Sequence, residues 1–338
     1  EVWILMSNLV PVGALRFNTE TSKLEYFNGT RYVNITTDSP EQNTGGTRGL
    51  FGGGFTSPSV TNEIDFINVD STGNAIDFGD LQQARRGIAG TASRIRGIFA
   101  GGRVPGDVNS IEFVTIASQG GGADFGDLTI TSHYGTGLSN GTRGIILAME
   151  NSNWGSNNSN RIDFIAIAST GNAQDFGDLY TGTRETDGCE SKTRGIVFGG
   201  TPSSINVIQF ITMSTQGDSA DFGDTTSNSQ RGSAGSNAVR GLLTLGTTPT
   251  TVNTVNFITI ATLGNALDFG DLTQVRGNAT GTSSPTRFVE AGGATPSLVD
   301  TIDYAQIMTK GDFNDFGELV GTDRSQLAGL SNGHGGLG

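Results

Sequence analysis

The sequence predicts an all-β fold, a six-bladed β-propeller preceded by a small N-terminal β-hairpin module. Three observations support this prediction. The motif Asp-Phe-Gly-Asp, with Glu in the last place of the final copy, occurs six times at steps of 46 to 51 residues, which is typical of a repeat architecture. Short runs of β-branched and aromatic residues separate the copies, as expected for strands. We find no long stretch with the apolar spacing of a helix.

The recurrence identifies this motif as a structural element rather than an active site, because a catalytic centre is normally unique in a chain. We expect each Phe to fill an equivalent position between neighbouring sheets and each Gly to allow a positive φ or a close backbone approach. We expect the flanking acids to cap backbone N–H groups in turns. The motif residues are Asp77, Phe78, Asp80, Asp124, Phe125, Asp127, Asp175, Phe176, Asp178, Asp221, Phe222, Asp224, Asp268, Phe269, Asp271, Asp315, Phe316 and Glu318.

Each repeat is expected to contain four short strands in about 47 residues, the size of a propeller blade. In the second repeat these are Arg96–Gly102, Ser110–Ala117 and Ala123–Leu128, and a looser segment, Tyr134–Asn140, completes the unit. Strands with apolar residues on both faces, such as Phe257–Ala261, favour stacked blades over one sheet with a solvated side.

An arginine begins each glycine-ended strand of the repeat. We expect one acid of each motif to pair with this arginine and the other to be solvated. Calcium is an alternative partner for the acids, but two acids separated by a ring supply fewer oxygens than calcium loops use. We therefore predict no metal site. The arginines are Arg48, Arg96, Arg143, Arg194, Arg240 and Arg287.

The end of the chain is predicted to close the ring. Asp323–Ser331 resembles the segments that precede other repeats, such as Arg86–Thr91. Its strand is therefore expected to join the first blade, which begins at Thr47, and to leave no open edge that would invite aggregation. We assign residues 47–338 to the propeller and residues 1–46 to an attachment module and linker.

The N-terminal module is predicted from alternating residues between Val12 and Val33, with Asn28 and Gly29 forming a type I′ turn. A hairpin of this size is not stable alone. It must pack on the propeller, on copies of itself or on another protein.

Composition excludes several functions. The net charge is −13 without clusters of Lys or Arg, so a nucleic-acid partner is disfavoured, and no apolar run is long enough for membrane insertion. The one cysteine, Cys189, has acidic neighbours, which disfavour a reactive thiolate. We expect His133 and His334 to be solvated in loops, since neither has a second ligand at metal spacing. We predict no catalytic residues and no cofactor.

The best candidate for binding is the longest loop after a glycine-ended strand, Glu150–Asn160. Trp154 lies there among Asn and Ser residues, including Asn153 and Asn157. An aromatic platform with adaptable hydrogen-bonding neighbours suits sugar stacking or protein docking. The alternative is that Trp154 folds back over the rim of the propeller.

Residues 47–338 resemble the kelch repeat. The resemblance is carried by double-glycine strand ends, such as Ala100-Gly101-Gly102 and Phe198-Gly199-Gly200, and by the order of the following strands. Phe stands where kelch repeats usually have Trp, and their Tyr-Asp pair is missing. The resemblance implies a propeller fold.

A second resemblance is to virion proteins of tailed phages, particularly marine cyanophages. It is carried by the segments Val12–Thr19 and Lys23–Val33, which look like a hairpin module of phage fibres, and by the repeat as a whole. This implies a non-enzymatic fibre, tail or capsid appendage on the virion surface. Residues 1–46 would then bind other virion proteins, or copies of the chain, and the propeller would bind a protein or a host-surface glycan. The alternatives are a bacterial cell-surface adhesin or carbohydrate-binding propeller and, third, a propeller hydrolase.

Overall fold

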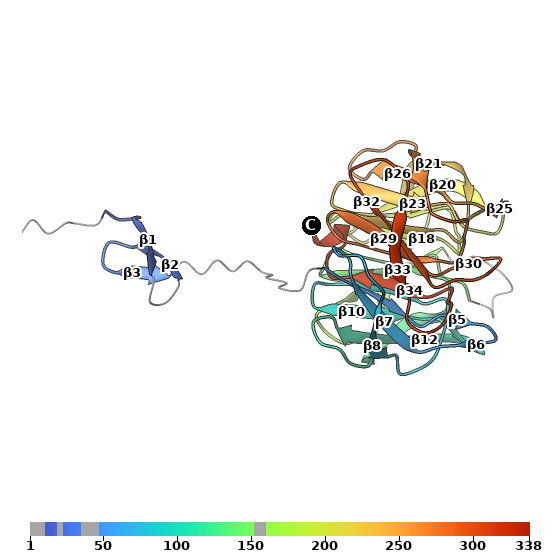
Figure 1. Cartoon of the computed structure of the whole chain (residues 1–338), viewed down its shortest axis with the longest axis horizontal. Coiled ribbons are helices and arrows are strands. Elements are labelled where there is room, and N and C mark those ends of the chain that lie inside the picture. Colours follow the sequence, from blue (N-terminus) through green and yellow to red (C-terminus); the bar gives the residue numbers. More distant parts are fainter. Residues whose placement is uncertain (1–10, 19–22, 35–46, 152–159) are drawn as a thin grey trace, which may run out of the picture. The chain divides into compact units, whose positions relative to one another are not determined.

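The chain divides into two compact units, which we call the small unit, Glu1–Thr44, and the large unit, Gly45–Gly338. The computed structural model describes residues 11–18, 23–34, 47–151 and 160–338. Both units are built from antiparallel β-strands (Figure 1). A single turn of 3-10 helix, η2 (Gly335–Leu337), follows the last strand.

The described part of the large unit contains six antiparallel sheets of four main strands each. The first strands are β34 (Ala328–Ser331), β9 (Ala89–Ala92), β14 (Thr136–Ser139), β18 (Asp187–Glu190), β22 (Ser233–Ser236) and β28 (Thr280–Ser283). The second strands are β4 (Arg48–Gly52), β10 (Arg96–Ala100), β15 (Arg143–Leu147), β19 (Arg194–Phe198), β23 (Arg240–Thr244) and β29 (Arg287–Ala291). The third strands are β7 (Glu63–Asn68), β12 (Gly106–Thr115), β16 (Arg161–Ala166), β20 (Ile205–Thr212), β26 (Thr254–Thr259) and β32 (Thr301–Gln306). The fourth strands are β8 (Ile76–Asp80), β13 (Ala123–Ser132), β17 (Gln174–Asp178), β21 (Ala220–Ser229), β27 (Leu267–Asp271) and β33 (Asn314–Glu318).

Short hairpins extend from the segment between the second and third strands. Their strands are β5 (Phe55–Thr56) with β6 (Ser59–Val60), β11 (Arg103–Val104) with the start of β12, β24 (Thr247–Thr248) with β25 (Thr250–Thr251), and β30 (Ala294–Thr295) with β31 (Ser297–Leu298).

The last strand of the chain belongs to the first sheet. β34 pairs with β4, with Leu330 opposite Leu50, as the sequence predicts. The segment Tyr134–Asn140 was expected to complete the repeat of Arg96, but its strand β14 pairs with β15 and therefore begins the next sheet. In each sheet the first strand thus comes from the segment that precedes the second strand. For the first sheet this strand is β34, from the other end of the chain, which pairs with β4.

The six first strands pack against one another in a closed cycle, in the order β34, β9, β14, β18, β22, β28 and back to β34. Two residues before each first strand, the backbone adopts a positive φ of 52° to 63°. Five amide–carbonyl hydrogen bonds of 2.8 to 2.9 Å connect neighbouring residues of this set, which we call the backbone ring. Its members are Gly87, Tyr134, Glu185, Arg231, Asn278 and Gln326.

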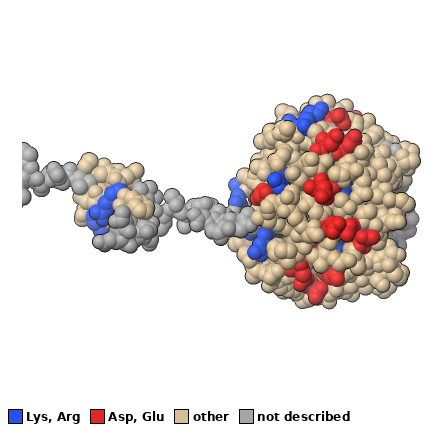
Figure 2. All heavy atoms as spheres, viewed as in Figure 1, with Lys and Arg blue, Asp and Glu red and all other residues tan. Residues whose placement is uncertain are grey.

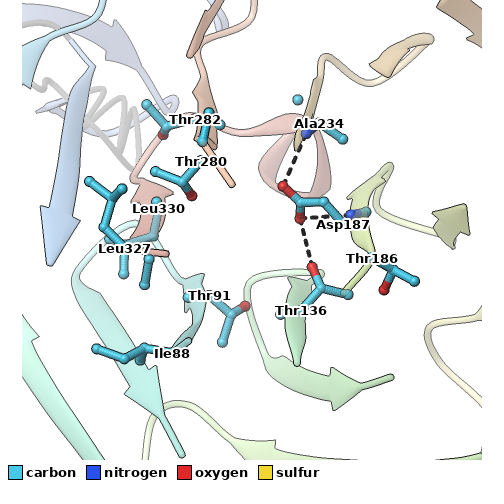
Figure 3. A pocket seen from close by; sticks show the side chains of 18 of the residues that line it. Ile88, Thr91, Thr136, Thr186, Asp187, Ala234, Thr280, Thr282, Leu327 and Leu330 are labelled. Atoms are coloured by element: carbon cyan, nitrogen blue, oxygen red, sulfur yellow. Dashed lines mark hydrogen bonds between the residues drawn. The ribbon is translucent and has the colours of Figure 1, made fainter. Parts of the chain in front are cut away.

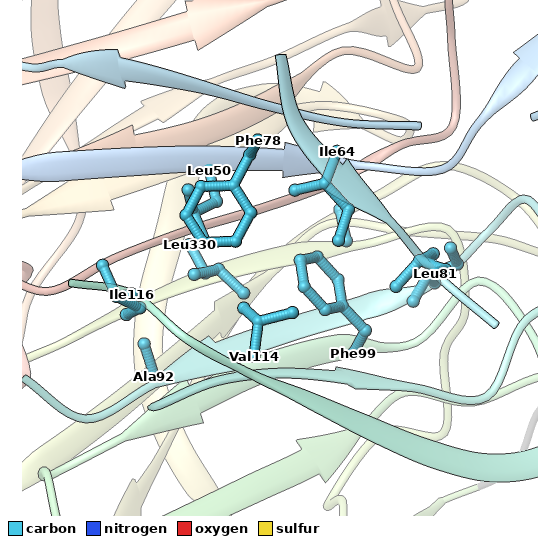
Figure 4. Close-up of a cluster of buried hydrophobic side chains, with 11 residues drawn as sticks. Leu50, Ile64, Phe78, Leu81, Ala92, Phe99, Val114, Ile116 and Leu330 are labelled. Carbon is cyan, nitrogen blue, oxygen red and sulfur yellow. The ribbon is translucent and has the colours of Figure 1, made fainter. Parts of the chain in front are cut away.

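The motif Phe residues lie between neighbouring sheets. Phe78 is 2% exposed and packs with Leu50 and Ile64 of its own sheet and with Val114 and Ile116 of the next (Figure 4). Its ring also meets Phe66 edge to face, 6.0 Å between centroids. Each such Phe contributes about 1.5–3 kcal/mol through burial, and the motif Gly after it has a φ of 144° to 155° in all six copies.

The acids of the motif do not cap turns, so that prediction is wrong. Eleven of the twelve are exposed and Asp224 is half-buried, and Figure 2 shows acidic groups gathered on the visible face of the large unit. The capping group comes instead from the turn of the following repeat. For example, the backbone N–H of Asp127 donates to Asn172 Oδ1 at 3.0 Å, and that of Asp271 donates to Asp312 Oδ1 at 3.1 Å.

The recurring arginines do not pair with the motif acids either. Each guanidinium lies over an aromatic ring of the third strand, 4.5 to 5.3 Å from its centroid. Each also donates to a backbone carbonyl of the next sheet, as Arg96 does to Ile167 at 3.0 Å and Arg287, from the last sheet, does to Val69 of the first at 3.4 Å. The arginines therefore connect neighbouring sheets.

The small unit is a three-stranded sheet of β1 (Leu15–Asn18), β2 (Lys23–Phe27) and β3 (Tyr32–Asn34). The predicted type I′ turn is wrong, because Gly29 has a positive φ and Asn28 does not. The Asn28 side chain instead accepts hydrogen bonds from the N–H groups of Thr30 and Arg31 at 3.0 and 2.9 Å.

Candidate functional site

The six first strands enclose a cavity of about 120 Å³, which we call the axial cavity (Figure 3). Its wall is largely main chain, because the second residue of most first strands is Gly. A Cβ atom on Gly329 would lie 2.3 Å from the carbonyl oxygen of Gly281, and one on Gly90 would lie 2.5 Å from that of Gly329. The strands can approach this closely only without side chains at these positions.

The backbone ring surrounds one end of the axial cavity, which we call the mouth. Glu185 and Arg231 form an ion pair there, with 2.9 Å between Oε2 and Nε. The hairpins lie at the same end, since single backbone bridges join Gly277 to Ala294 of β30 and Arg86 to Arg103 of β11.

The C-terminal segment covers the other end of the first strands, which we call the tail end. His334 contacts the Glu190 carboxylate through Nδ1, and its Nε2 lies 3.0 Å from the carbonyl oxygen of Ala92. Glu190 and Ala92 are the last residues of β18 and β9. The pairing with Glu190 and these hydrogen bonds outweigh burial, so the pKa of His334 is raised.

Asp187 is the acidic residue that begins first strand β18. Its carboxylate accepts hydrogen bonds from the Thr136 hydroxyl at 2.7 Å, from the Gly188 N–H at 2.7 Å and from the Ala234 N–H at 3.1 Å (Figure 3). Burial in the cavity wall raises the pKa of Asp187 to about 7, although these hydrogen bonds act in the opposite direction.

This pKa predicts a pH dependence of stability. An unfolded Asp has a pKa of about 3.9, so the folded state binds the proton more tightly. The resulting stabilisation is complete below pH 4 and is lost as the pH rises through about 7. Between pH 5 and 8 we expect the wild type to lose about 2 kcal/mol of unfolding free energy that Asp187→Asn does not lose.

Urea titrations at both pH values, with a chelator present, measure this difference. The amide variant lacks the acceptor for the Ala234 N–H, so the pH dependences are compared and not the absolute stabilities. Equal pH dependences in the two proteins would contradict the assignment.

Three threonine hydroxyls in the wall have no hydrogen-bond partner in the described part of the chain. They belong to Thr91, Thr186 and Thr282, which are 4%, 9% and 4% exposed. An unsatisfied buried hydroxyl costs about 1–3 kcal/mol. The axial cavity is therefore suited to a polar occupant.

Among the described candidate residues chosen from the sequence, only His334 lines the axial cavity. Trp154, Asn153 and Asn157 lie outside the described residues. His133 and His334 were expected in solvated loops, but they are 2% and 9% exposed.

His133 is held by acidic neighbours, with Nδ1 3.1 Å from Asp107 Oδ1 and Nε2 3.6 Å from Glu150 Oε2. Cys189 is buried, which, together with the negative charges of Glu190 and Asp187, raises the pKa of its thiol. Asp107 and Glu150 are distant from His133 in the sequence, so the local composition gave no sign of these partners, whereas the acidic neighbours of Cys189 are adjacent to it. The axial cavity was also missed, although the Gly in the second position of five first strands was a usable signal.

No family model matches the chain, and no curated protein is similar to it in sequence. Within the described ranges, no helix is long and apolar enough to cross a membrane. The same residues contain no group of three or more His, Cys, Asp or Glu side chains arranged to hold a metal ion.

Proposed function

We propose that the large unit is a six-bladed β-propeller that acts as a non-enzymatic display module of a tailed-phage particle. Three cyclic patterns support the architecture: the packing of the first strands, the backbone ring, and the arginines that bind the next sheet. In each pattern the last sheet is connected to the first.

The position of the chain entry is the observation that carries the display function. Thr47, where the described part of the large unit begins, lies against Gly333 in the C-terminal segment, and the Arg48 N–H donates to Asn332 Oδ1 at 2.9 Å. The chain therefore enters at the tail end, opposite the mouth and the hairpins. The hairpin side is the end of the large unit away from this entry, and it is the surface that we propose for binding a protein or a host-surface glycan.

The hairpin side also has a groove. It lies between the hairpins β5–β6 and β30–β31 and is lined by Phe55, Pro296 and Leu298, with the polar Thr322 and Asp323 beside them. Apolar and polar groups together suit a polysaccharide or a peptide segment.

Two experiments test this function. Mass spectrometry of purified particles of a phage that encodes the chain is expected to detect it, and deletion of residues 1–46 is expected to prevent its incorporation.

On a glycan array, Trp154→Ala is expected to lose at least tenfold in binding, because the substitution removes the proposed stacking platform. Ile95→Ala, which changes a 66% exposed residue between β9 and β10, is the control. Absence from particles, together with a secretion signal in the gene, would favour the alternative, a bacterial adhesin.

A further inference from the structure

The axial cavity contains one carboxylate without a basic partner. The other charged residues of its lining are matched, Glu185 by Arg231 and Glu190 by His334. Asp187 has only neutral donors among the described residues: a hydroxyl and two amides. A carboxylate removed from water is costly unless it is neutralised by a proton or a cation.

Asp187 also has room for a further ligand. A carboxylate has about four lone-pair positions, and three donors approach Asp187. Thr136 and Gly188 both donate to Oδ1, whereas only Ala234 donates to Oδ2. In Figure 3 the carboxylate lies at the cavity, with Thr91 and Thr280 on other parts of the wall.

The remaining polar groups of the wall are mostly neutral hydroxyls and main-chain groups, beside apolar side chains such as Ile88, Leu327 and Leu330. Thr91 and Thr282 line the cavity and their hydroxyls are buried and unpartnered, and the glycine-rich first strands line it with main chain. Carboxylate, hydroxyl and carbonyl oxygens are the ligands of hard cations, while thiol and imidazole groups select softer metals. The thiol of Cys189 is not part of the lining, and the imidazole of His334 is engaged by Glu190.

We propose that the axial cavity binds a hard metal cation, Ca²⁺, Na⁺ or K⁺, at the Asp187 carboxylate, with neutral oxygens and water completing its shell. A volume of about 120 Å³ accommodates an ion with a few waters, each of which occupies about 30 Å³. A single carboxylate implies weaker binding than in calcium modules with several carboxylates, with a Kd on the order of 1 mM or higher for Ca²⁺. This inference does not depend on the proposed role in a phage particle.

Thermal unfolding at pH 8 tests the proposal. The full chain is first treated with EDTA and dialysed into tetramethylammonium chloride, whose methyl groups prevent coordination of the cation by oxygen ligands. CaCl₂, NaCl or KCl is then added at constant ionic strength. We expect at least one of the three salts to raise the Tm of the wild type by about 2–4 °C.

Two variants distinguish the site from general salt effects. Asp187→Asn is expected to abolish the shift, whereas Asp221→Asn, which removes an exposed motif acid, is expected to retain it. Thr91→Val keeps the shape of the side chain and is expected to reduce the shift by removing one oxygen. The proposal is overturned if no salt raises the wild-type Tm, or if Asp187→Asn shows the same shift as the wild type. Either result would leave water as the occupant.

Discussion

Gly235→Leu is expected to destabilise the large unit by about 3 kcal/mol or more. A Cβ atom on Gly235 would lie 2.3 Å from Cδ2 of Phe288, and this ring is 0% exposed, so it has no solvent to move into. Gly235 is the third residue of first strand β22, and Phe288 is the second residue of β29 in the next sheet. Urea unfolding, monitored by far-UV circular dichroism, measures the loss of unfolding free energy.

The other junctions explain why this pair matters. At two other junctions the third residue of the first strand is Leu and the second residue of the facing strand is Gly. A Cβ atom on Gly195 would lie 2.7 Å from Leu138 Cδ1, and one on Gly97 would lie 2.9 Å from Leu330 Cδ1. At the junction of β22 with β29 the large and small residues have changed places. Each of these three junctions therefore holds one large side chain opposite a Gly.

Because the large and the small residue are exchanged at this junction, we predict that the second substitution restores stability lost through the first. Phe288→Gly alone is expected to cost about 3–5 kcal/mol through the cavity it leaves. The double variant Gly235→Leu/Phe288→Gly reproduces the arrangement of Leu138 and Gly195, and we expect a favourable coupling energy of at least about 2 kcal/mol. Strictly additive losses would show that the two positions do not share one space.

The sequence was sufficient for most strands, because these depend on local patterns repeated along the chain. The motif Phe and the closing strand Ala328–Ser331 are examples. The sequence nevertheless placed Tyr134–Asn140 in the preceding sheet. The sequence was not sufficient to predict which groups the charged side chains contact. Arg48 donates to the backbone carbonyl of Ile116, 68 residues away in the sequence. The sequence alone does not show which residues of the adjacent sheet lie beside the arginine, so an acid of the same repeat was the expected partner.

The same limit applies to the axial cavity. Asp187 occurs in a short segment with Glu185 and Glu190, and nothing local distinguishes the three acids. The structure separates them: Glu185 and Glu190 have basic partners, and Asp187 is left among neutral donors. A comparison of equivalent positions between repeats would have helped, since the other first strands begin with Ala, Ser or Thr.

Arg85→Thr is expected to lower the unfolding free energy by about 3–5 kcal/mol, because it leaves a buried acid without its cation. Arg85 is 0% exposed, and its Nη2 lies 3.0 Å from Glu112 Oε1 in the neighbouring sheet. Arg276 with Asp303, and Arg324 with Asp65, form equivalent buried pairs. Chemical denaturation of the wild type and the variant at pH 7 measures the loss.

The neutral junctions supply the control for this prediction. Where the third strand carries Gln209 in place of an acid, the position of Arg85 is occupied by Thr183, whose hydroxyl donates to the Gly199 carbonyl at 3.0 Å. Gln209 Oε1 still accepts from the Thr181 N–H at 2.8 Å, as Glu112 Oε2 accepts from the Gln82 N–H at 2.7 Å.

The double variant Arg85→Thr/Glu112→Gln therefore converts a charged junction into a neutral one that the chain already uses. We expect it to recover most of the stability lost in Arg85→Thr, since the acceptor for Gln82 is kept and no buried charge remains. If the double variant is no more stable than Arg85→Thr, the loss comes from the volume of the arginine side chain. In that case charge matching would not explain why Arg occurs at some junctions and Ser or Thr at others.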